Sequence, residues 1–208
     1  MHRAYPSRSR STRTCRISGA AGSRKSAATT PPAAQESWSS SPQGLPNYTL
    51  AAFFGRTVLG EVPFQDFFAA IPSLRSRCGD RAVLRAYHYY KDNQRVLLQQ
   101  EALERGDFAA FLRLVRQSGL SSYMYLQNVS NYRDSRDQCV AVLLAAAEEL
   151  LEEEGACRVH GGGFAGTIQA FVPLPRLAAF RAGMEAVAGR GSCHVLSIRD
   201  TGSVLLVS

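Results

Sequence analysis

Gly-Ala-Cys-Arg-Val-His-Gly-Gly-Gly-Phe-Ala-Gly-Thr-Ile-Gln-Ala-Phe-Val-Pro, residues 155–173, is the stretch that decides the fold. Four glycines lie within six residues, at Gly161, Gly162, Gly163 and Gly166. Glycine loses more conformational freedom on folding than any other residue, so this cluster indicates a backbone that needs positive φ or a close approach. Residues 156–159 can form a short strand, and residues 167–172 alternate with a period of two. The pattern predicts a strand, a glycine loop and a second strand.

Three interpretations of the glycine loop compete. Gly161, Gly163 and Gly166 spell G-x-G-x-x-G, but the dinucleotide-binding form of that motif needs a helix directly after the loop, and a strand is expected here. A protein-kinase glycine loop is excluded because no V-A-I-K, H-R-D or D-F-G motif follows it. A plain tight connection without a ligand stays open, since glycine loops are often only turns.

The segment 158–166, Arg-Val-His-Gly-Gly-Gly-Phe-Ala-Gly, resembles the third, C-terminal motif of galactokinases, within the wider sugar- and mevalonate-kinase superfamily. The usual family form ends in Gly-Gly-Gly-Phe-Gly-Gly, so Ala165 departs from it by a methyl group. Residues 85–88 and 93–95 resemble the family's long helix before the motif, and residues 106–108 and 117–122 resemble the next helix and its serine turn. The match covers roughly residues 51–208 and implies an ATP-dependent sugar 1-kinase, with galactose as the favoured substrate.

The resemblance also implies which parts of the active site this chain lacks. Galactokinases grip the sugar with a Gly-Arg…Gly-Glu-His segment, cradle the triphosphate with Pro-x-Gly-x-Gly-Leu-Ser-Ser-Ser, and use a carboxylate near the C1 hydroxyl; none of these occurs here. Their third motif buttresses the phosphate loop near the sugar and the γ-phosphate. The site residues carried over are therefore only Gly161, Gly162, Gly163, Phe164, Ala165 and Gly166.

No catalytic residue and no metal ligand is assigned to this chain. The resemblance places ATP, Mg and galactose in the complete enzyme, together with an N-terminal kinase half, and we expect this chain alone to be inactive and to bind neither cofactor tightly. Two classes of function stay open: a galactokinase of which this is a truncated or misread C-terminal half, and a non-catalytic sugar-sensing or regulatory module derived from one. A remnant without function is a third.

Length and cysteine usage limit the fold and the compartment. A chain of 208 residues has room for one domain, or for one domain and a tail. The five cysteines are odd in number and form no C-x-x-C pair, which argues against a disulfide framework or a zinc site and favours a cytoplasmic protein. No apolar run approaches the roughly 18 residues that a membrane span needs.

The first 46 residues differ in composition from the rest. They hold seven Lys and Arg against the single acidic Glu36, and no Val or Phe, whereas the remainder holds 17 basic and 16 acidic residues. Residues 1–46 are therefore predicted to be a disordered Arg/Ser-rich head, and an out-of-frame origin is our preferred hypothesis. A transit peptide and a basic interaction tail stay open. The near-neutral body, residues 47–208, argues against nucleic-acid binding.

Helical spacing in the body predicts a helix over 63–70, a long helix from the N-cap Asp80 to Gly106, a helix capped by Asp107 and ending by Gly119, and a helix that opens at Ser130 or Asn131. A further helix over 175–188 and strands over 193–198 and 204–207 follow. This order favours a two-layer α+β sandwich, and the resemblance implies the ferredoxin-like C-terminal domain of a two-domain kinase.

Two groups of polar residues are predicted to be structural. His88 is expected to be a satisfied histidine in the long helix, because no carboxylate or cysteine was found at ligand spacing beside it. The glutamates that crowd residues 148–154 are expected to form a solvated acidic face, since a helix C-terminus is mildly unfavourable for negative charge.

Overall fold

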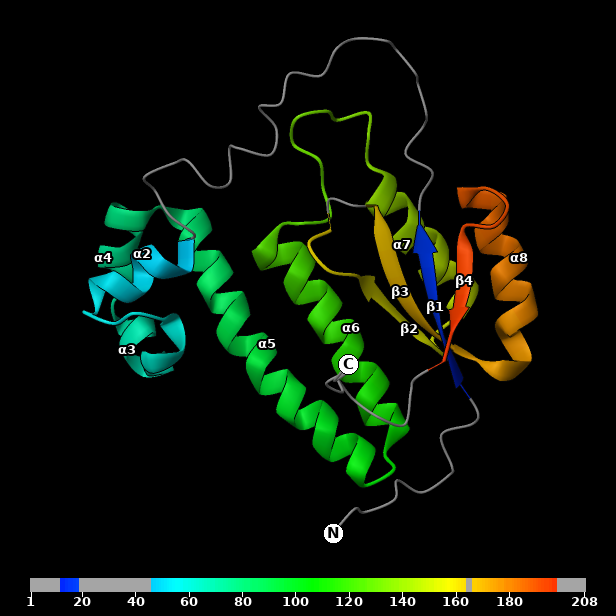
Figure 1. Ribbon diagram of the computed structural model, residues 1–208, viewed down its shortest axis with the longest axis horizontal. Helices are drawn as coiled ribbons and strands as arrows, with labels where there is room; N and C mark the ends of the chain where they lie inside the picture. The colour runs from blue at the N-terminus through cyan, green and yellow to red at the C-terminus, as the bar shows by residue number, and fades with distance from the viewer. Residues whose placement is uncertain (1–11, 19–45, 164–165, 198–208) are drawn as a thin grey trace, which may run out of the picture.

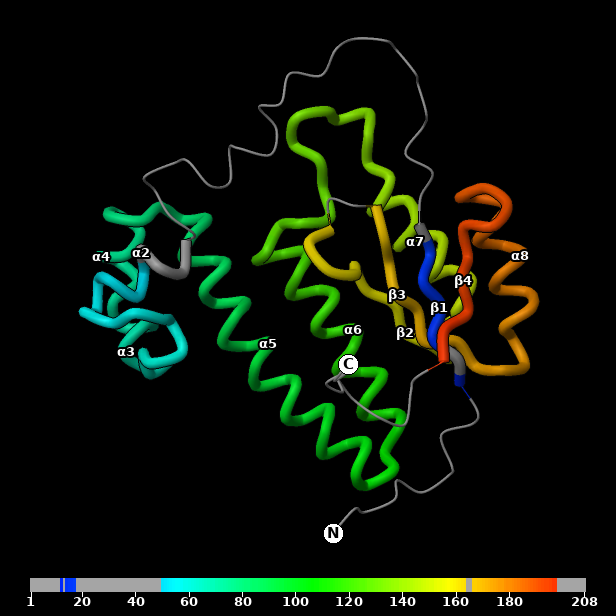
Figure 2. Tube along the Cα trace, in the orientation of Figure 1, coloured from blue at the N-terminus to red at the C-terminus, as the bar shows by residue number. Residues whose placement is uncertain are grey.

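The computed structural model describes residues 12–18, 46–163 and 166–197. Figure 1 shows a small sheet with helices on both sides, and a helical part built from the first half of the body. Figure 2 follows the same path as a tube along the Cα atoms. The helices are α2 Pro46–Phe53, α3 Phe64–Ala69, α4 Ile71–Cys78, α5 Asp80–Glu104, α6 Phe108–Ser121, α7 Cys139–Leu151 and α8 Leu177–Ala188, and the strands are β1 Thr12–Ser18, β2 Ala156–Val159, β3 Thr167–Pro173 and β4 Cys193–Leu196.

The sheet has the strand order β2-β3-β1-β4, and every neighbouring pair is antiparallel. Helices α7 and α8 cover one face, where Phe180 and Met184 join the buried side chains of the strands. Helix α6 lies against the other face, where the rings of Phe111 and Phe171 meet edge to face at 5.2 Å. The alternation in β3 produces this division, because Ile168, Ala170 and Val172 are fully buried under α7 and α8. The α+β class is therefore confirmed, but the prediction of two layers is wrong, because helices pack against both faces of the sheet.

A second hydrophobic cluster lies away from the sheet, among α2, α3, α4 and the first half of α5. Phe67, Leu50 and Leu74 are its largest fully buried side chains, and the rings of Phe64 and Tyr90 lie beside Phe67. Tyr90 fastens the short turn η2 (Leu59–Glu61) to α5 by donating its hydroxyl to the carbonyl oxygens of Leu59 and Val62. The long helix α5 thus carries this cluster at its N-terminal end and packs against α6 along its length.

The prediction of a disordered head is wrong for residues 12–18. They form β1, which lies between β3 and β4 in the middle of the sheet. The physical reason is local: Cys15 and Ile17 alternate with the exposed Arg16, and both are fully buried against α7 and α8. The composition of residues 1–46 as a whole concealed this short period of two. The rest of the head, residues 1–11 and 19–45, lies outside the described residues.

The predicted start of a helix at Ser130 or Asn131 is also wrong, because α7 begins only at Cys139. The Asn131 side chain accepts hydrogen bonds from the backbone N–H groups of Arg133 and Asp134, so it closes an isolated turn. The Gln138 side chain then bonds back to the backbone of Asn131 and to the carbonyl oxygen of Asp134. Local side-chain hydrogen bonds have replaced the first turns of the expected helix.

The other predicted elements hold, with small shifts at their ends. The long helix ends at Glu104 before Gly106, and Asp107 caps α6 by accepting from the backbone N–H of Ala110 at 2.9 Å. Asp80, the predicted N-cap of the long helix, is instead its first residue and pairs with Arg75. The strand expected at residues 204–207 lies outside the described residues.

Candidate functional site

The glycine loop joins β2 to β3 as predicted, and its backbone uses the freedom of glycine at three positions. Gly161, Gly163 and Gly166 have φ values of 63°, 83° and 70°, in the left-handed region that other residues rarely adopt. The backbone N–H of His160 donates to the Thr167 carbonyl oxygen at 3.0 Å, and that of Gly166 donates to Gly163 at 3.1 Å. Phe164 and Ala165, two of the predicted site residues, lie outside the described residues.

The inner side of the loop is pinned by the chain itself. A Cβ atom at Gly163 would lie 1.9 Å from the backbone oxygen of Asn128. Only glycine fits at this point, because such a separation is far shorter than a van der Waals contact. The glycine cluster predicted a close approach of another part of the molecule. At Gly163 that part is the backbone of Asn128, in the segment that leads from α6 to α7.

The outer side of the loop is open. A Cβ atom at Gly161, Gly162 or Gly166 would meet no atom within 4 Å in the described part of the chain, its own chain neighbours aside. Gly162 has no positive φ and is exposed, so neither its backbone nor its packing within the chain requires glycine. The loop thus combines one buried glycine with an exposed, uncrowded surface that something outside this chain can approach.

Asn128 is delivered to the loop by an unusual turn. Helix α6 continues into the π-helical turn η3 (Ser122–Leu126), and Gln127 then adopts a left-handed conformation with φ 55° and ψ 45°. Asn128 is only 4% exposed, yet neither its Oδ1 nor its Nδ2 has a hydrogen-bond partner among the described residues. The Ser122 hydroxyl is buried and has no partner in that part of the chain either. Because a buried polar group without a partner costs about 1–3 kcal/mol, and π-turns cluster at functional sites, this turn marks the loop's inner side as a candidate site.

The base of the loop is held by a satisfied polar network. Arg158 of β2 donates to the Ser118 hydroxyl, and that hydroxyl donates to Asp92 of α5. His88 lies 2.9 Å from the Ser121 hydroxyl through Nδ1 and 3.8 Å from Asp92 through Nε2. Burial lowers the pKa of His88, although the charge of Asp92 opposes the shift. The network fastens β2 to α5 and α6, and it corrects the statement that no carboxylate stands at ligand spacing to His88.

The glutamates of residues 148–154 do not gather into a site. Leu151 ends α7, and Glu152 and Glu153 take left-handed backbone conformations beyond it. Arg176 pairs with Glu152 and lies 3.7 Å from Glu154, and this ion pair lowers the pKa of Glu152. Within the described ranges, no group of three His, Cys, Asp or Glu side chains could hold a metal ion.

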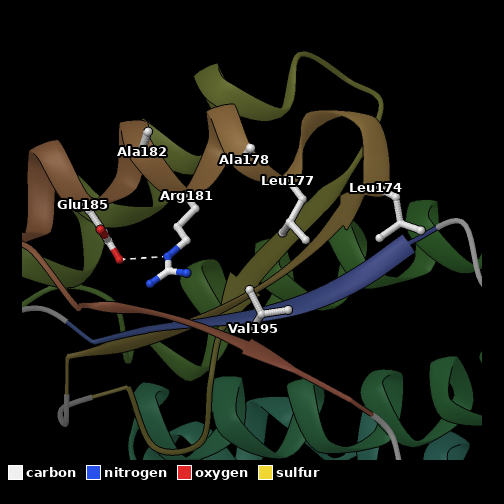
Figure 3. A pocket seen from close by; sticks show the side chains of 7 residues that line it. All are labelled: Leu174, Leu177, Ala178, Arg181, Ala182, Glu185 and Val195. Carbon is white, nitrogen blue, oxygen red and sulfur yellow. Dashed lines mark hydrogen bonds and ion pairs between the residues drawn. The ribbon is translucent and has the colours of Figure 1, made fainter.

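A shallow groove between α8 and the edge strand β4 lies away from the loop. Figure 3 shows Leu177 and Val195 facing each other across it, with the ion pair between Arg181 and Glu185 at 3.0 Å on its rim. These side chains offer apolar surface and one satisfied ion pair, and no candidate nucleophile or base.

Sequence reasoning missed Asn128 and the π-turn before it. The segment Tyr-Met-Tyr-Leu-Gln-Asn, residues 123–128, contains neither glycine nor proline, so no residue type in it predicts a left-handed conformation at Gln127.

No helix among the described residues is long and apolar enough to cross a membrane.

The chain is thus of the α+β class, with an antiparallel sheet whose β2–β3 connection is a glycine-rich loop. The inner side of this loop packs against Asn128, which follows the π-turn. No family model matches the chain. It is 32% identical over 127 residues to the galactokinase of Mannheimia succiniciproducens, covering 61% of this chain and 31% of that protein. It is 31% identical over 134 residues to the galactokinase of Pasteurella multocida, covering 63% of this chain and 32% of that protein.

The fold shows the same likeness. The crystal structure of Lactococcus lactis galactokinase in complex with galactose matches with a TM-score of 0.60 at 22% identity, covering 89% of this chain and 45% of that one. The resemblance of this chain to the C-terminal half of galactokinases is therefore confirmed. The chain matches about a third of the length of these curated relatives.

Proposed function

We propose that this chain is the C-terminal part of an ATP-dependent galactokinase, which transfers a phosphoryl group from ATP to the C1 hydroxyl of galactose. The observation that carries the proposal is the glycine loop, pinned inside at Gly163 and open outside at Gly162, in a chain similar to galactokinases. An open glycine backbone allows a phosphate loop or a substrate to come closer than any side chain would. Gly161, Gly162, Gly163, Phe164, Ala165 and Gly166 are the proposed contact residues.

The chain's own residues would position rather than react. Phosphoryl transfer depends mostly on positioning and charge stabilisation, and the sugar grip, the triphosphate cradle and the carboxylate of galactokinases are not in this sequence. ATP and Mg supply the phosphoryl group and its charge neutralisation in the complete enzyme. The loop would then support the phosphate-binding segment of an N-terminal kinase half, and the network of Arg158, Ser118 and Asp92 would hold β2 in place beneath it.

The finer features of the fold belong to the same proposal. The order β4-β1-β3-β2, with α7 between β1 and β2 and α8 between β3 and β4, supports a ferredoxin-like domain that carries a helical insertion after β1. We take this domain to be residues 47–208 completed by β1. A cytoplasmic location is proposed for two reasons: the cysteines are free thiols, as is usual in a reducing compartment, and the relatives are named galactokinases. The sugar-sensing alternative is not favoured, because the relatives are named galactokinases.

The test is reassembly. The chain is co-expressed with the remaining N-terminal part of the Mannheimia succiniciproducens galactokinase, and ADP release is measured with galactose and Mg-ATP. We expect galactose-dependent turnover by the co-purified pair and only background rates from either part alone. Two parts that co-purify without turnover would sink the enzymatic proposal, and turnover by the chain alone would sink the statement that it lacks catalytic groups.

A further inference from the structure

Two arginines of α5 lack an acidic partner. Arg81 is exposed, donates to the Tyr132 hydroxyl at 3.0 Å and lies over the Tyr132 ring, 4.7 Å from its centroid. Arg85 lies one turn further along, is half-buried, and has a buried Nε atom for which residues 12–18, 46–163 and 166–197 offer no hydrogen-bond partner. Neither forms an ion pair with a carboxylate in the described part of the chain, whereas Arg75, Arg95, Arg158, Arg176 and Arg181 all do.

This arrangement is electrostatically incomplete. Burial lowers the pKa of the Arg85 guanidinium, and the positive charge of Arg81 lowers it further. Like charges at positions i and i+4 of a helix repel, and a partly buried cation without a counter-ion is costly. A group with two negative charges would balance both guanidiniums at once, whereas a single carboxylate would balance one. Guanidinium groups suit phosphate in particular, because their planar fork of N–H donors matches two phosphate oxygens.

Hydrogen bonds connect Arg81 to the segment that packs against the glycine loop. Arg81 donates to the Tyr132 hydroxyl, which in turn donates to the backbone oxygen of Gln127. Gln127 directly precedes Asn128, the residue whose backbone packs against Gly163. Arg81 and Gly163 of the loop thus both contact the same short segment, residues 127–132.

We propose that Arg81, which Tyr132 holds in place, and Arg85 form a binding site for a phosphate group of a small-molecule ligand. The choice of a nucleotide or sugar phosphate as its natural source rests on the proposed function. The site itself is a property of this chain, and phosphate binding to it requires no N-terminal half. Its affinity for a lone phosphate ligand should be weak, because two arginines and no backbone cradle supply it.

The test is a titration of the full chain with inorganic pyrophosphate at low ionic strength, followed by the ³¹P chemical shift and by calorimetry. We expect saturable binding that weakens with added salt. Arg81→Gln and Arg85→Gln should each weaken it by roughly tenfold or more, as expected for the loss of a charge-assisted hydrogen bond. The matched control is Arg113→Gln on α6, which removes the same charge from an exposed arginine without an ion pair, and it should leave binding nearly unchanged.

Further arms make the test decisive. Arg85→Lys keeps the charge and loses the fork, so it should bind less tightly than wild type and more tightly than Arg85→Gln. Arg81 is exposed, so Arg81→Gln should fold even if an Arg85 variant does not. Three outcomes would overturn the proposal: no pyrophosphate binding by the wild-type chain, equal loss in the Arg113 control, or equally tight binding of malonate. Because the titration uses the chain alone, its failure is distinct from a failure of the reassembled halves to turn over.

Discussion

Ile17→Ala is the substitution that most directly probes the central strand. Ile17 is fully buried and lies opposite Ile168 of β3 and Cys193 of β4, so both neighbouring strands lose a contact when its side chain is shortened. Core Ile→Ala changes cost about 2–5 kcal/mol, comprising the lost transfer energy and the cavity that remains. A position enclosed by strands on both sides has little room to collapse, which places the expected loss in the upper part of that range.

The assay is urea unfolding followed by far-UV circular dichroism. We expect a lower midpoint with an unchanged slope for Ile17→Ala, because the surface exposed on unfolding stays the same. Arg16→Ala is the matched control: Arg16 is the exposed neighbour in the same strand, and surface changes usually stay within about 0.5 kcal/mol. Equal midpoints for the two variants would refute the reasoning, since Ile17 would then not be part of the core.

Three further predictions concern the loop and the residues around it. Gly163→Ala should destabilise the chain by more than about 2 kcal/mol, because it combines a positive φ with a clash against the Asn128 backbone. The control Gly162→Ala should change the stability by no more than about 0.5 kcal/mol. Similar urea midpoints for the two variants would contradict this prediction. Asn128→Leu should stabilise the chain by about 1–2 kcal/mol, since it removes two buried polar atoms that have no partner among the described residues. Ser118→Ala, which breaks the satisfied network, should destabilise the chain. A loss of stability in Asn128→Leu would contradict the claim that the Asn128 amide is unpaired. Burial lowers the folded-state pKa of His88, so the stability contributed by the uncharged ring is present above its ordinary pKa of 6.5 and is lost as the pH falls through the folded-state pKa. His88→Gln should flatten this part of the curve of stability against pH. An unchanged curve would show that another group titrates there.

The parts of the fold that follow local rules could be predicted from the sequence. Asp107 caps α6 because its side chain can reach a free backbone N–H, and β2, the loop and β3 follow from the glycine cluster and the period of two. The long helix α5 was evident from its apolar spacing. Each of these depends on residues within a few positions of one another.

The missed features depend on distant partners. Nothing in Thr-Arg-Thr-Cys-Arg-Ile-Ser, residues 12–18, shows that it pairs with β3 and β4, more than 140 positions away. Asn131 is compatible with both a helix start and an isolated turn, and hydrogen bonds between the distant Gln138 side chain and the Asn131 backbone stabilise the turn. Likewise, the closeness of Gly163 to Asn128 arises from the packing of the α6–α7 connection, which no local pattern encodes. The candidate site was therefore predictable as a loop, and its inner wall was not.

The most direct measurement of the central claim is the galactose-dependent ADP release of the reassembled pair carrying Gly162→Val. Gly162 is exposed, has no positive φ and has open space around it, so the variant chain should unfold at nearly the wild-type urea midpoint. Ala179→Val, on an exposed face of α8, adds the same bulk away from the loop and serves as the control. We predict that Gly162→Val abolishes turnover while Ala179→Val preserves it. Full turnover with Gly162→Val in a normally folded chain would show that the loop is a plain turn and would contradict the account.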